Sequence, residues 1–176
     1  MKQFFILSTL LLTSINSFCQ HTKSNTYSQK QTLLEDKQAL RELVDDISIL
    51  TDDKNTSLQV LLFTENATME SYQDSQLLSK RSGRKQITEF FNEYLDLFET
   101  TYHTNGQQKL TIKGNKATGV TYCQAVLISK QDGHHLRTTS GIIYYDTYVK
   151  EKGKWYIAKR ITNIRWSDVK ELKIGQ

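Results

Sequence analysis

The sequence predicts an α+β domain in which a cone-shaped, curved antiparallel sheet wraps around N-terminal helices and encloses one pocket. In the first hundred residues, apolar side chains recur at spacings of three, four and seven, which is typical of amphipathic helices. From residue 107 to 166 the period drops to two, with turns at Gly114-Asn115, Asp132-Gly133 and Lys152-Gly153, as in an antiparallel meander. Long strands packed on few helices favour a sheet that curls around a cavity, where small ligands commonly bind.

The helices are predicted from their apolar stripes and from the polar residues that end them. The first should begin near Gln31 and end near Asp52-Asp53, because short polar side chains there compete for backbone hydrogen bonds. A short second helix is predicted over residues 57–63, a strand over 67–72 and a further helix from Gly83 to Phe98. The buried face of the first helix is expected to comprise Leu33, Leu34, Leu40, Leu43, Val44, Ile47 and Leu50.

Alternation assigns the faces of the later strands, since successive side chains of a strand point to opposite sides. The strand after residue 115 should present Val120, Tyr122, Gln124, Val126 and Ile128 on one face. The next strand should present Thr138, Ser140, Ile142, Tyr144 and Asp146 together. The last, over residues 155–164, should place Trp155, Ile157 and Ile161 on one face.

Residues 1–19 have the layout of a secretory signal peptide. Lys2 is followed by an apolar run from Phe4 to Leu12, with Ser17 and Cys19 suited to cleavage before Gln20. That run is shorter than the roughly 20 residues of a membrane-spanning helix, so no stable membrane insertion is expected. We therefore expect a periplasmic or secreted protein. A lipid anchor on Cys19 stays open as an alternative.

The rest of the chain divides into three predicted segments. Residues 20–31 are polar and aperiodic and should form a flexible lead, 32–168 should form the α+β domain, and 169–176 a C-terminal tail. Cleavage would leave Cys123 as the single cysteine, so no intrachain disulfide could form. Cys123 falls in a strand and is expected to be a small buried hydrophobic residue.

The charge pattern argues against nucleic acid as a partner. The formal net charge is +4 and the basic residues are scattered, without a basic stripe carrying interleaved aromatics. The cluster at residues 80–85 should solvate a loop before a helix. His134 and His135 are adjacent on a strand and therefore point to opposite faces, and no zinc-type spacing is present. The sequence predicts neither a metal nor a cofactor.

Four short motifs, in order over roughly residues 32–167, resemble the SnoaL-like branch of the nuclear transport factor 2-like superfamily. The first motif is Asp52-Asp53 followed by residues 61–67, and the second is the glycine-led stretch 83–87 followed by Phe90-Phe91. The third combines residues 102–105 with residues 112–117, and the fourth is residues 153–157 with Arg160. The order is more specific for fold than for function, because the superfamily includes dehydratases, isomerases, cyclases and non-catalytic binding modules.

The resemblance implies a catalytic pair formed by Asp52 and His103. A carboxylate can orient an imidazole that takes a proton next to a carbonyl or helps a hydroxyl leave. Two departures weaken that assignment, because Ile47 replaces a tyrosine of dehydratase-like relatives and Ile143 replaces an arginine. Both groups also have purely structural alternatives, Asp52 as a helix cap and His103 as a hydrogen-bonded core histidine.

Two functions follow from these observations. The first is an exported protein whose apolar pocket binds a small hydrophobic molecule, or a protein partner, without catalysis. The second is a cofactor-independent lyase or isomerase that uses Asp52 and His103 on a hydroxy-carbonyl substrate; a separation within about 3.2 Å inside the pocket would favour it. A homodimer through the outer sheet face is compatible with both. The pocket is expected to be lined by Ile47, Tyr122, Gln124 and Tyr144.

Overall fold

The computed structural model describes the backbone of residues 10–173 and the side chains of residues 29–173. The chain forms two compact units, residues 1–38 and 39–176. Most of the apolar run predicted as a signal peptide, and residues 174–176 of the predicted tail, lie outside the described residues. Cleavage and export therefore stay predictions. Within the described part of the chain, no helix combines the length and apolar character needed to cross a membrane.

The first helix, α1 (Leu10–Asp52), is longer than the sequence pattern indicates. The lead predicted as flexible over residues 20–31 is helical, and the helix does not begin near Gln31. No glycine or proline interrupts this stretch, and extending an existing helix adds one hydrogen bond for each residue fixed. Leu33 and Leu34, predicted on the buried face, are 41% and 57% exposed.

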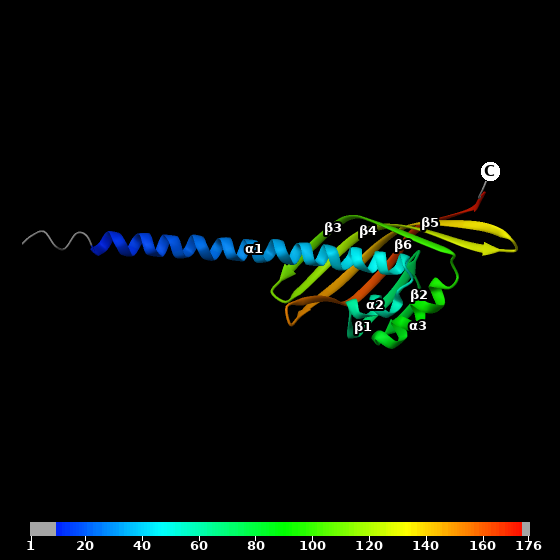
Figure 1. Cartoon of the computed structure of the whole chain (residues 1–176), viewed down its shortest axis with the longest axis horizontal. Helices are drawn as coiled ribbons and strands as arrows, with labels where there is room; N and C mark the ends of the chain where they lie inside the picture. The colour runs from blue at the N-terminus through cyan, green and yellow to red at the C-terminus, as the bar shows by residue number, and fades with distance from the viewer. Residues whose placement is uncertain (1–9, 174–176) are drawn as a thin grey trace, which may run out of the picture. The chain divides into compact units, whose positions relative to one another are not determined.

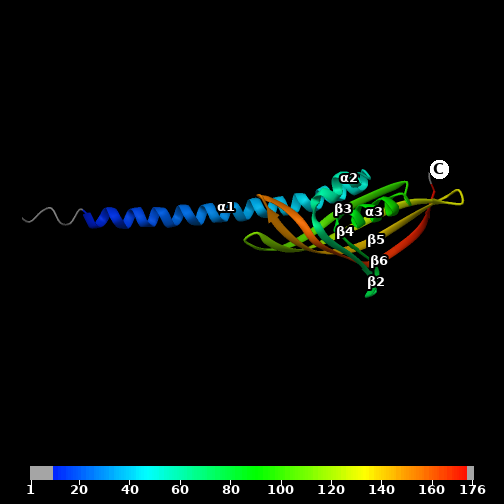
Figure 2. The same cartoon turned by 90° about the horizontal axis from the view of Figure 1, so that it is seen from below.

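The second unit packs helices on one face of a six-stranded sheet (Figures 1 and 2). After α1 come α2 (Thr56–Gln59), η1 (Val60–Leu62), β1 (Phe63–Gln73), β2 (Gln76–Ser82), α3 (Gly83–Leu95), β3 (Thr100–Lys113), β4 (Lys116–Gln131), β5 (His134–Glu151) and β6 (Lys154–Leu172). The strand order is β2-β1-β6-β5-β4-β3. All neighbours are antiparallel except β1 and β6. The predicted α+β class with a curved sheet is confirmed.

The hydrophobic core lies between the helices and the concave face of the sheet. The last turns of α1 bury Leu40, Leu43, Val44 and Ile47 at helical spacing. They pack with Phe63 and other buried residues of β1, α3, β4, β5 and β6. The predicted apolar face of α1 is therefore present from residue 40 onward.

Tight turns join most of the strands, and one of them was missed. The predicted hairpins at Asp132-Gly133 and Lys152-Gly153 have positive φ at both residues, as type I′ turns require. Asp74 and Ser75 adopt the same conformation without glycine and join β1 to β2. Residues 80–82 therefore belong to an edge strand rather than to a loop. The alternation rule could not find β2, because most of its side chains are exposed on both faces.

A β-bulge in β6 overturns the face predicted for the last strand. Tyr148 pairs with Ile157 while Thr147 pairs with Lys159, so β6 contains one extra residue at Ala158. Beyond the bulge, Arg160 lies on the inner face beside Trp155 and Ile157, and Ile161 lies on the outer face. The strand also continues to Leu172, past the predicted end near residue 164 and into the predicted tail.

Candidate active site

A cavity of about 280 Å³ lies between the helices and the sheet. Apolar and aromatic side chains supply 12 of its 21 lining residues, and polar or charged side chains supply the other nine. Leu78 of β2 and Tyr94 of α3 line it and are also partly exposed to solvent. The lining residues are Ile47, Ser48, Thr51, Gln59, Met69, Ser71, Leu78, Ser79, Phe90, Phe91, Tyr94, Leu95, His103, Ala125, Leu127, Ser140, Ile142, Tyr144, Arg160, Thr162 and Ile164.

Asp52 and His103 form a close pair, in which His103 lines this cavity and Asp52 lies behind it, outside the lining residues. Asp52 is the last residue of α1 and His103 lies in β3. The Asp52 carboxylate accepts the His103 backbone N–H at 2.8 Å, and its other oxygen lies 2.6 Å from His103 Nδ1. Because an ionised carboxylate only accepts hydrogen bonds, Nδ1 is the donor in this contact, and in the neutral form of the ring the lone pair would then lie on Nε2. Both side chains are largely buried, and His103 lines the cavity.

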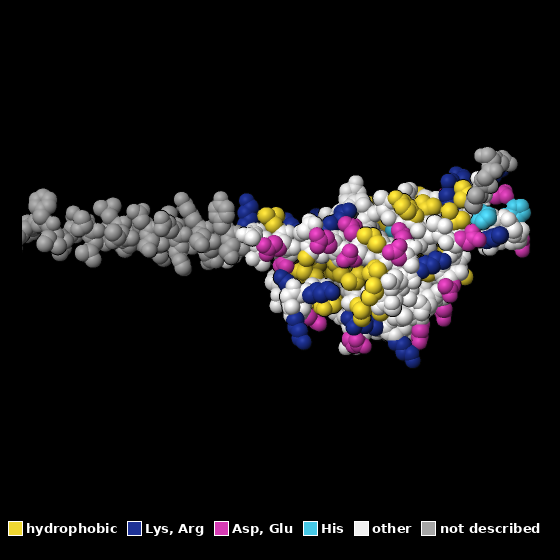
Figure 3. Space-filling model, in the orientation of Figure 1, with side chains coloured by type: hydrophobic (Ala, Val, Ile, Leu, Met, Phe, Trp, Pro, Cys, Tyr) yellow, Lys and Arg dark blue, Asp and Glu magenta, His cyan; other side chains and the backbone are white. Residues whose placement is uncertain are grey.

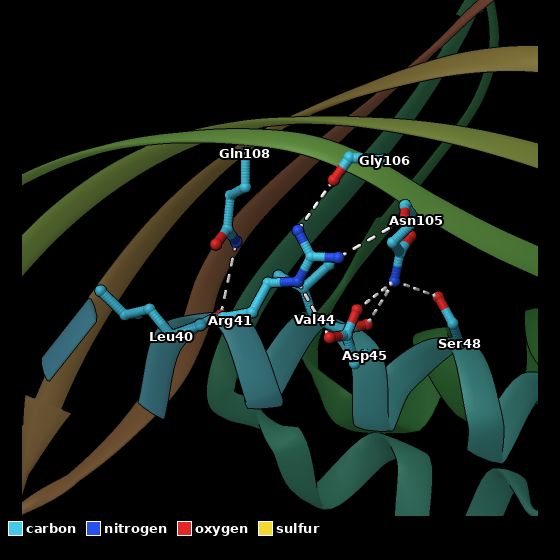
Figure 4. Close-up of polar contacts among 8 residues, drawn as sticks. All are labelled: Leu40, Arg41, Val44, Asp45, Ser48, Asn105, Gly106 and Gln108. Carbon is cyan, nitrogen blue, oxygen red and sulfur yellow. Dashed lines mark hydrogen bonds and ion pairs between the residues drawn. The ribbon is translucent and has the colours of Figure 1, made fainter. Parts of the chain in front are cut away.

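A clamp between α1 and β3 holds the two elements of this pair together (Figure 4). The pairing of β3 with β4 shifts between Asn105 and Gln108, which leaves carbonyl groups that β4 does not satisfy. Arg41 donates to the Gly106 carbonyl at 2.8 Å and to the Asn105 carbonyl at 3.4 Å. Its Nε is held by Asp45 one helical turn further on. The guanidinium therefore fixes the irregular segment of β3 to the helix.

Asn105 completes the clamp from the strand side, as Figure 4 shows. Its amide donates to Asp45 and to the Ser48 hydroxyl, each at 2.9 Å, and to the Val44 carbonyl at 3.3 Å. Asn105 lies two residues from His103 on the same face of β3. The clamp thus sets the register of β3 against α1, and with it the distance from His103 to Asp52.

Arg160 is a buried cation in the cavity wall that the sequence analysis did not assign to the site. Its Nε and Nη2 bond both oxygens of Asp146 at 2.9 and 2.8 Å, and its guanidinium lies 4.3 Å from the centre of the Tyr144 ring. Desolvation lowers the pKa of Arg160, but the adjacent Asp146 carboxylate more than offsets this, so the pKa is raised and the side chain stays charged. Its bonds to Asp146 use Nε and Nη2, and the residue lines the cavity, where its charge can act on a ligand.

Arg160 supplies a cation to the pocket although Ile143 stands where some relatives carry an arginine. The charge comes from the neighbouring strand, β6, instead of from β5. Alternation from Trp155 and Ile157 would have pointed Arg160 outward, and only the bulge at Ala158 turns it inward. No sequence signal marks that bulge.

The four predicted pocket residues divide into two pairs. Ile47 and Tyr144 line the cavity. The pKa of Tyr144 is raised well above its ordinary value, mainly because the side chain is buried and secondly because Cys123 lies nearby. The hydroxyl therefore stays protonated. Tyr122 is 50% exposed and Gln124 is exposed on the outer face, so their assignment to the pocket is wrong. The inner face of β4 carries Cys123, Ala125 and Leu127. Alternation alone could not show which of the two faces is the inner one.

His134 and His135 lie away from the cavity, at the turn between β4 and β5, where Figure 3 shows histidine side chains beside acidic ones. His134 Nδ1 lies 2.7 Å from Glu171, and His135 Nε2 lies 3.0 Å from Glu99. Across the described residues, no three histidine, cysteine, aspartate or glutamate side chains are grouped so that they could hold a metal ion.

The fold and the site together define a class: an α+β cone whose curved sheet and helices enclose a cavity, with a histidine in its wall that is paired with an aspartate at a helix end. A family model described as the SnoaL-like domain matches residues 32–161. The chain belongs to the SnoaL-like domain family, which confirms the resemblance found in the sequence.

Solved structures with the same fold span nearly the whole domain. A candidate scytalone dehydratase from Novosphingobium aromaticivorans is 19% identical, with a TM-score of 0.71, over 84% of this chain and 98% of the other. The hexachlorocyclohexane dehydrochlorinase LinA-type3 from Novosphingobium barchaimii is 14% identical, with a TM-score of 0.64, over 81% and 93%. An NTF2-like protein with a cystatin-like fold from N. aromaticivorans is 18% identical, with a TM-score of 0.62, over 80% and 88%. No curated protein matches the chain.

Proposed function

We propose that this protein is a cofactor-independent lyase or isomerase in which His103 is the general base. The observation that carries the proposal is the 2.6 Å contact between His103 Nδ1 and Asp52, with the imidazole in the cavity wall. Of the two functions that the sequence left open, this geometry favours catalysis over binding alone.

The chemistry needs a base, a group that orients it and a cation for the charge that develops. His103 Nε2 removes a proton from a carbon next to a carbonyl, while Asp52 fixes the ring and stabilises the imidazolium that forms. The electron pair of the broken C–H bond moves onto the carbonyl oxygen, where the Arg160 guanidinium offers a charged donor. In a lyase this electron pair returns to form a C=C bond as the C–O bond of the hydroxyl breaks, and the imidazolium protonates the leaving oxygen, so water departs. In an isomerase the imidazolium returns its proton to another carbon.

The names of two structural neighbours are in keeping with this chemistry. A dehydratase removes water and a dehydrochlorinase removes hydrogen chloride, and both reactions break a C–H bond. At 14–19% identity these neighbours establish the fold alone, so the role of His103 in this chain rests on the geometry of its own site.

Exchange of carbon-bound protons with solvent tests the base directly, whatever the leaving group of the substrate. The protein is incubated in D₂O with a panel of aromatic ketones and β-hydroxyketones, and loss of the α-proton signal is followed by NMR. We expect the wild type to accelerate exchange of at least one compound, and His103→Gln to lower that rate by about 10²–10⁴-fold.

His134→Gln is a matched control for that experiment. His134 also contacts a carboxylate through Nδ1, at 2.7 Å, but both side chains are more than half exposed and lie outside the cavity. This variant should exchange the α-proton as fast as the wild type. Equal rates in the wild type and His103→Gln would refute the enzyme proposal and leave a binding protein.

We also propose that the outer face of the sheet joins two copies of this chain. Tyr102, Tyr122, Tyr145 and Trp166 are each 42–62% exposed there. The strand pairing sets them beside Val120, Val126, Gly141 and Ile143, so a mainly uncharged patch spans β3 to β6, with Lys109 opposite Val120 at the β3 edge. A mainly uncharged face can pair with itself across a two-fold axis with little like-charge repulsion.

Sedimentation equilibrium tests this interface. The wild type should sediment as a dimer at micromolar concentration, and the double variant Tyr122→Lys, Tyr145→Lys as a folded monomer. Ser75→Lys, on the β1–β2 turn, is the control and should stay dimeric. A monomeric wild type would refute the interface.

A further inference from the structure

Gln59 is a fully buried polar residue in the cavity wall whose amide is only partly hydrogen-bonded. It ends α2 and has no exposed surface. Its Nε2 donates to the Thr51 hydroxyl, while its Oε1 has no hydrogen-bond partner among the described residues. Both Gln59 and Thr51 line the cavity. Buried polar atoms without partners are rare in folded proteins and call for an explanation.

The bonds of Thr51 fix which end of the Gln59 amide is left over. The single hydroxyl proton of Thr51 is donated to the Ile47 carbonyl at 2.7 Å, so its oxygen can only accept a further bond. Only the NH₂ end of Gln59 can supply that bond. A flipped amide would place two acceptor oxygens against each other, so Oε1 is held as the free end of the amide.

We propose that Gln59 Oε1 determines ligand specificity by accepting a hydrogen bond from an O–H or N–H group of the molecule that occupies the cavity. The ring of that molecule would lie against the aromatic wall formed by Phe90, Phe91 and Tyr94, where Phe90 and Tyr94 are stacked at 5.6 Å. The ligand class is therefore an aromatic compound with a hydrogen-bond donor. This inference deepens the proposed function, since it concerns the same cavity, but it does not require His103 to act as a base.

A pair of probes that differ in one donor tests the inference. Indole and benzothiophene are bicyclic aromatics of similar size and shape, and only indole carries an N–H. Their dissociation constants are measured by protein-observed NMR at up to millimolar concentration. We expect the wild type to bind indole about tenfold more tightly, because benzothiophene leaves the buried amide oxygen unpaired.

Two variants then test whether Gln59 Oε1 is the atom that causes the preference for indole over benzothiophene. Gln59→Met has a similar volume but no amide, so it should bind both probes with a ratio near one. Ser79 Oγ is another buried polar atom of the cavity wall that has no partner among the described residues, and Ser79→Ala should keep the wild-type ratio. If Gln59→Met does not fold, a structure of the wild type with indole should place the ring nitrogen within about 3.2 Å of Oε1.

Several outcomes would overturn the inference. They are equal affinities in the wild type, no binding of either probe, an unchanged ratio in Gln59→Met, or an indole nitrogen directed elsewhere in the complex. His103→Gln separates this inference from the proposed function. That variant should keep the preference for indole even if the exchange experiment shows no catalysis.

Discussion

Replacing Arg160 with methionine should destabilise the protein strongly, because it leaves a buried carboxylate without its charged partner. The Asp146 side chain is 1% exposed and the Arg160 side chain 5%. Asp146 accepts two bonds from Arg160 and one from the Tyr148 hydroxyl at 2.9 Å. Arg160→Met removes both charged bonds and retains only the one from Tyr148.

The expected loss is about 3–5 kcal/mol of unfolding free energy, the range found when one partner of a buried ion pair is removed. Domains of this size are stable by about 5–15 kcal/mol, so the variant should be near the limit of folding. The double variant Arg160→Met, Asp146→Leu removes both charges, and should recover most of the loss, because an apolar pair needs no desolvation of ions.

Urea denaturation, followed by far-ultraviolet circular dichroism, measures these differences. Lys170→Met is the control, since Lys170 and Asp168 lie 2.9 Å apart but their side chains are 65% and 49% exposed. Such a pair contributes about 0–1 kcal/mol. The reasoning fails if Arg160→Met costs no more than Lys170→Met, or if the double variant is no more stable than Arg160→Met.

Two further predictions concern Tyr144 and Gly141. The folded-state pKa of Tyr144 is raised by burial, so its contribution to stability is complete below the unfolded pKa of about 10 and is lost as pH rises through the folded value. Above pH 10 the unfolding free energy of Tyr144→Phe should therefore fall less steeply with pH than that of the wild type. The two slopes, measured by urea denaturation at a series of pH values, should differ by up to about 1.4 kcal/mol per pH unit. Equal slopes would contradict the burial argument. A Cβ at Gly141 would lie 2.2 Å from Trp166 Nε1, so Gly141→Ala should displace the half-exposed indole and shift its fluorescence to longer wavelength. An unchanged spectrum, compared with that of a Trp166→Phe reference, would show that the contact is not present in solution.

The sequence could predict those parts of the fold in which apolar side chains recur at regular intervals. The apolar stripe from Leu40 to Ile47 and the two glycine-containing turns gave the helix, the hairpins and the α+β class correctly. The extent of α1 and the presence of β2 could not be predicted, because neither carries its own hydrophobic pattern. The inner face of β4 was misassigned because alternation fixes which residues share a face, but not which face is buried.

The candidate site shows the same division. The sequence by itself determined that Asp52 lies at the end of a predicted helix and that His103 lies at the start of a predicted strand. The family resemblance then named these two residues as a pair. Only the tertiary structure placed Nδ1 2.6 Å from the carboxylate, turned Arg160 inward through the bulge at Ala158, and left Gln59 Oε1 without a partner. Local patterns record which residues are compatible with a helix or a strand. Distances across the cavity depend on register shifts and packing between elements far apart in the chain, and no local pattern encodes them.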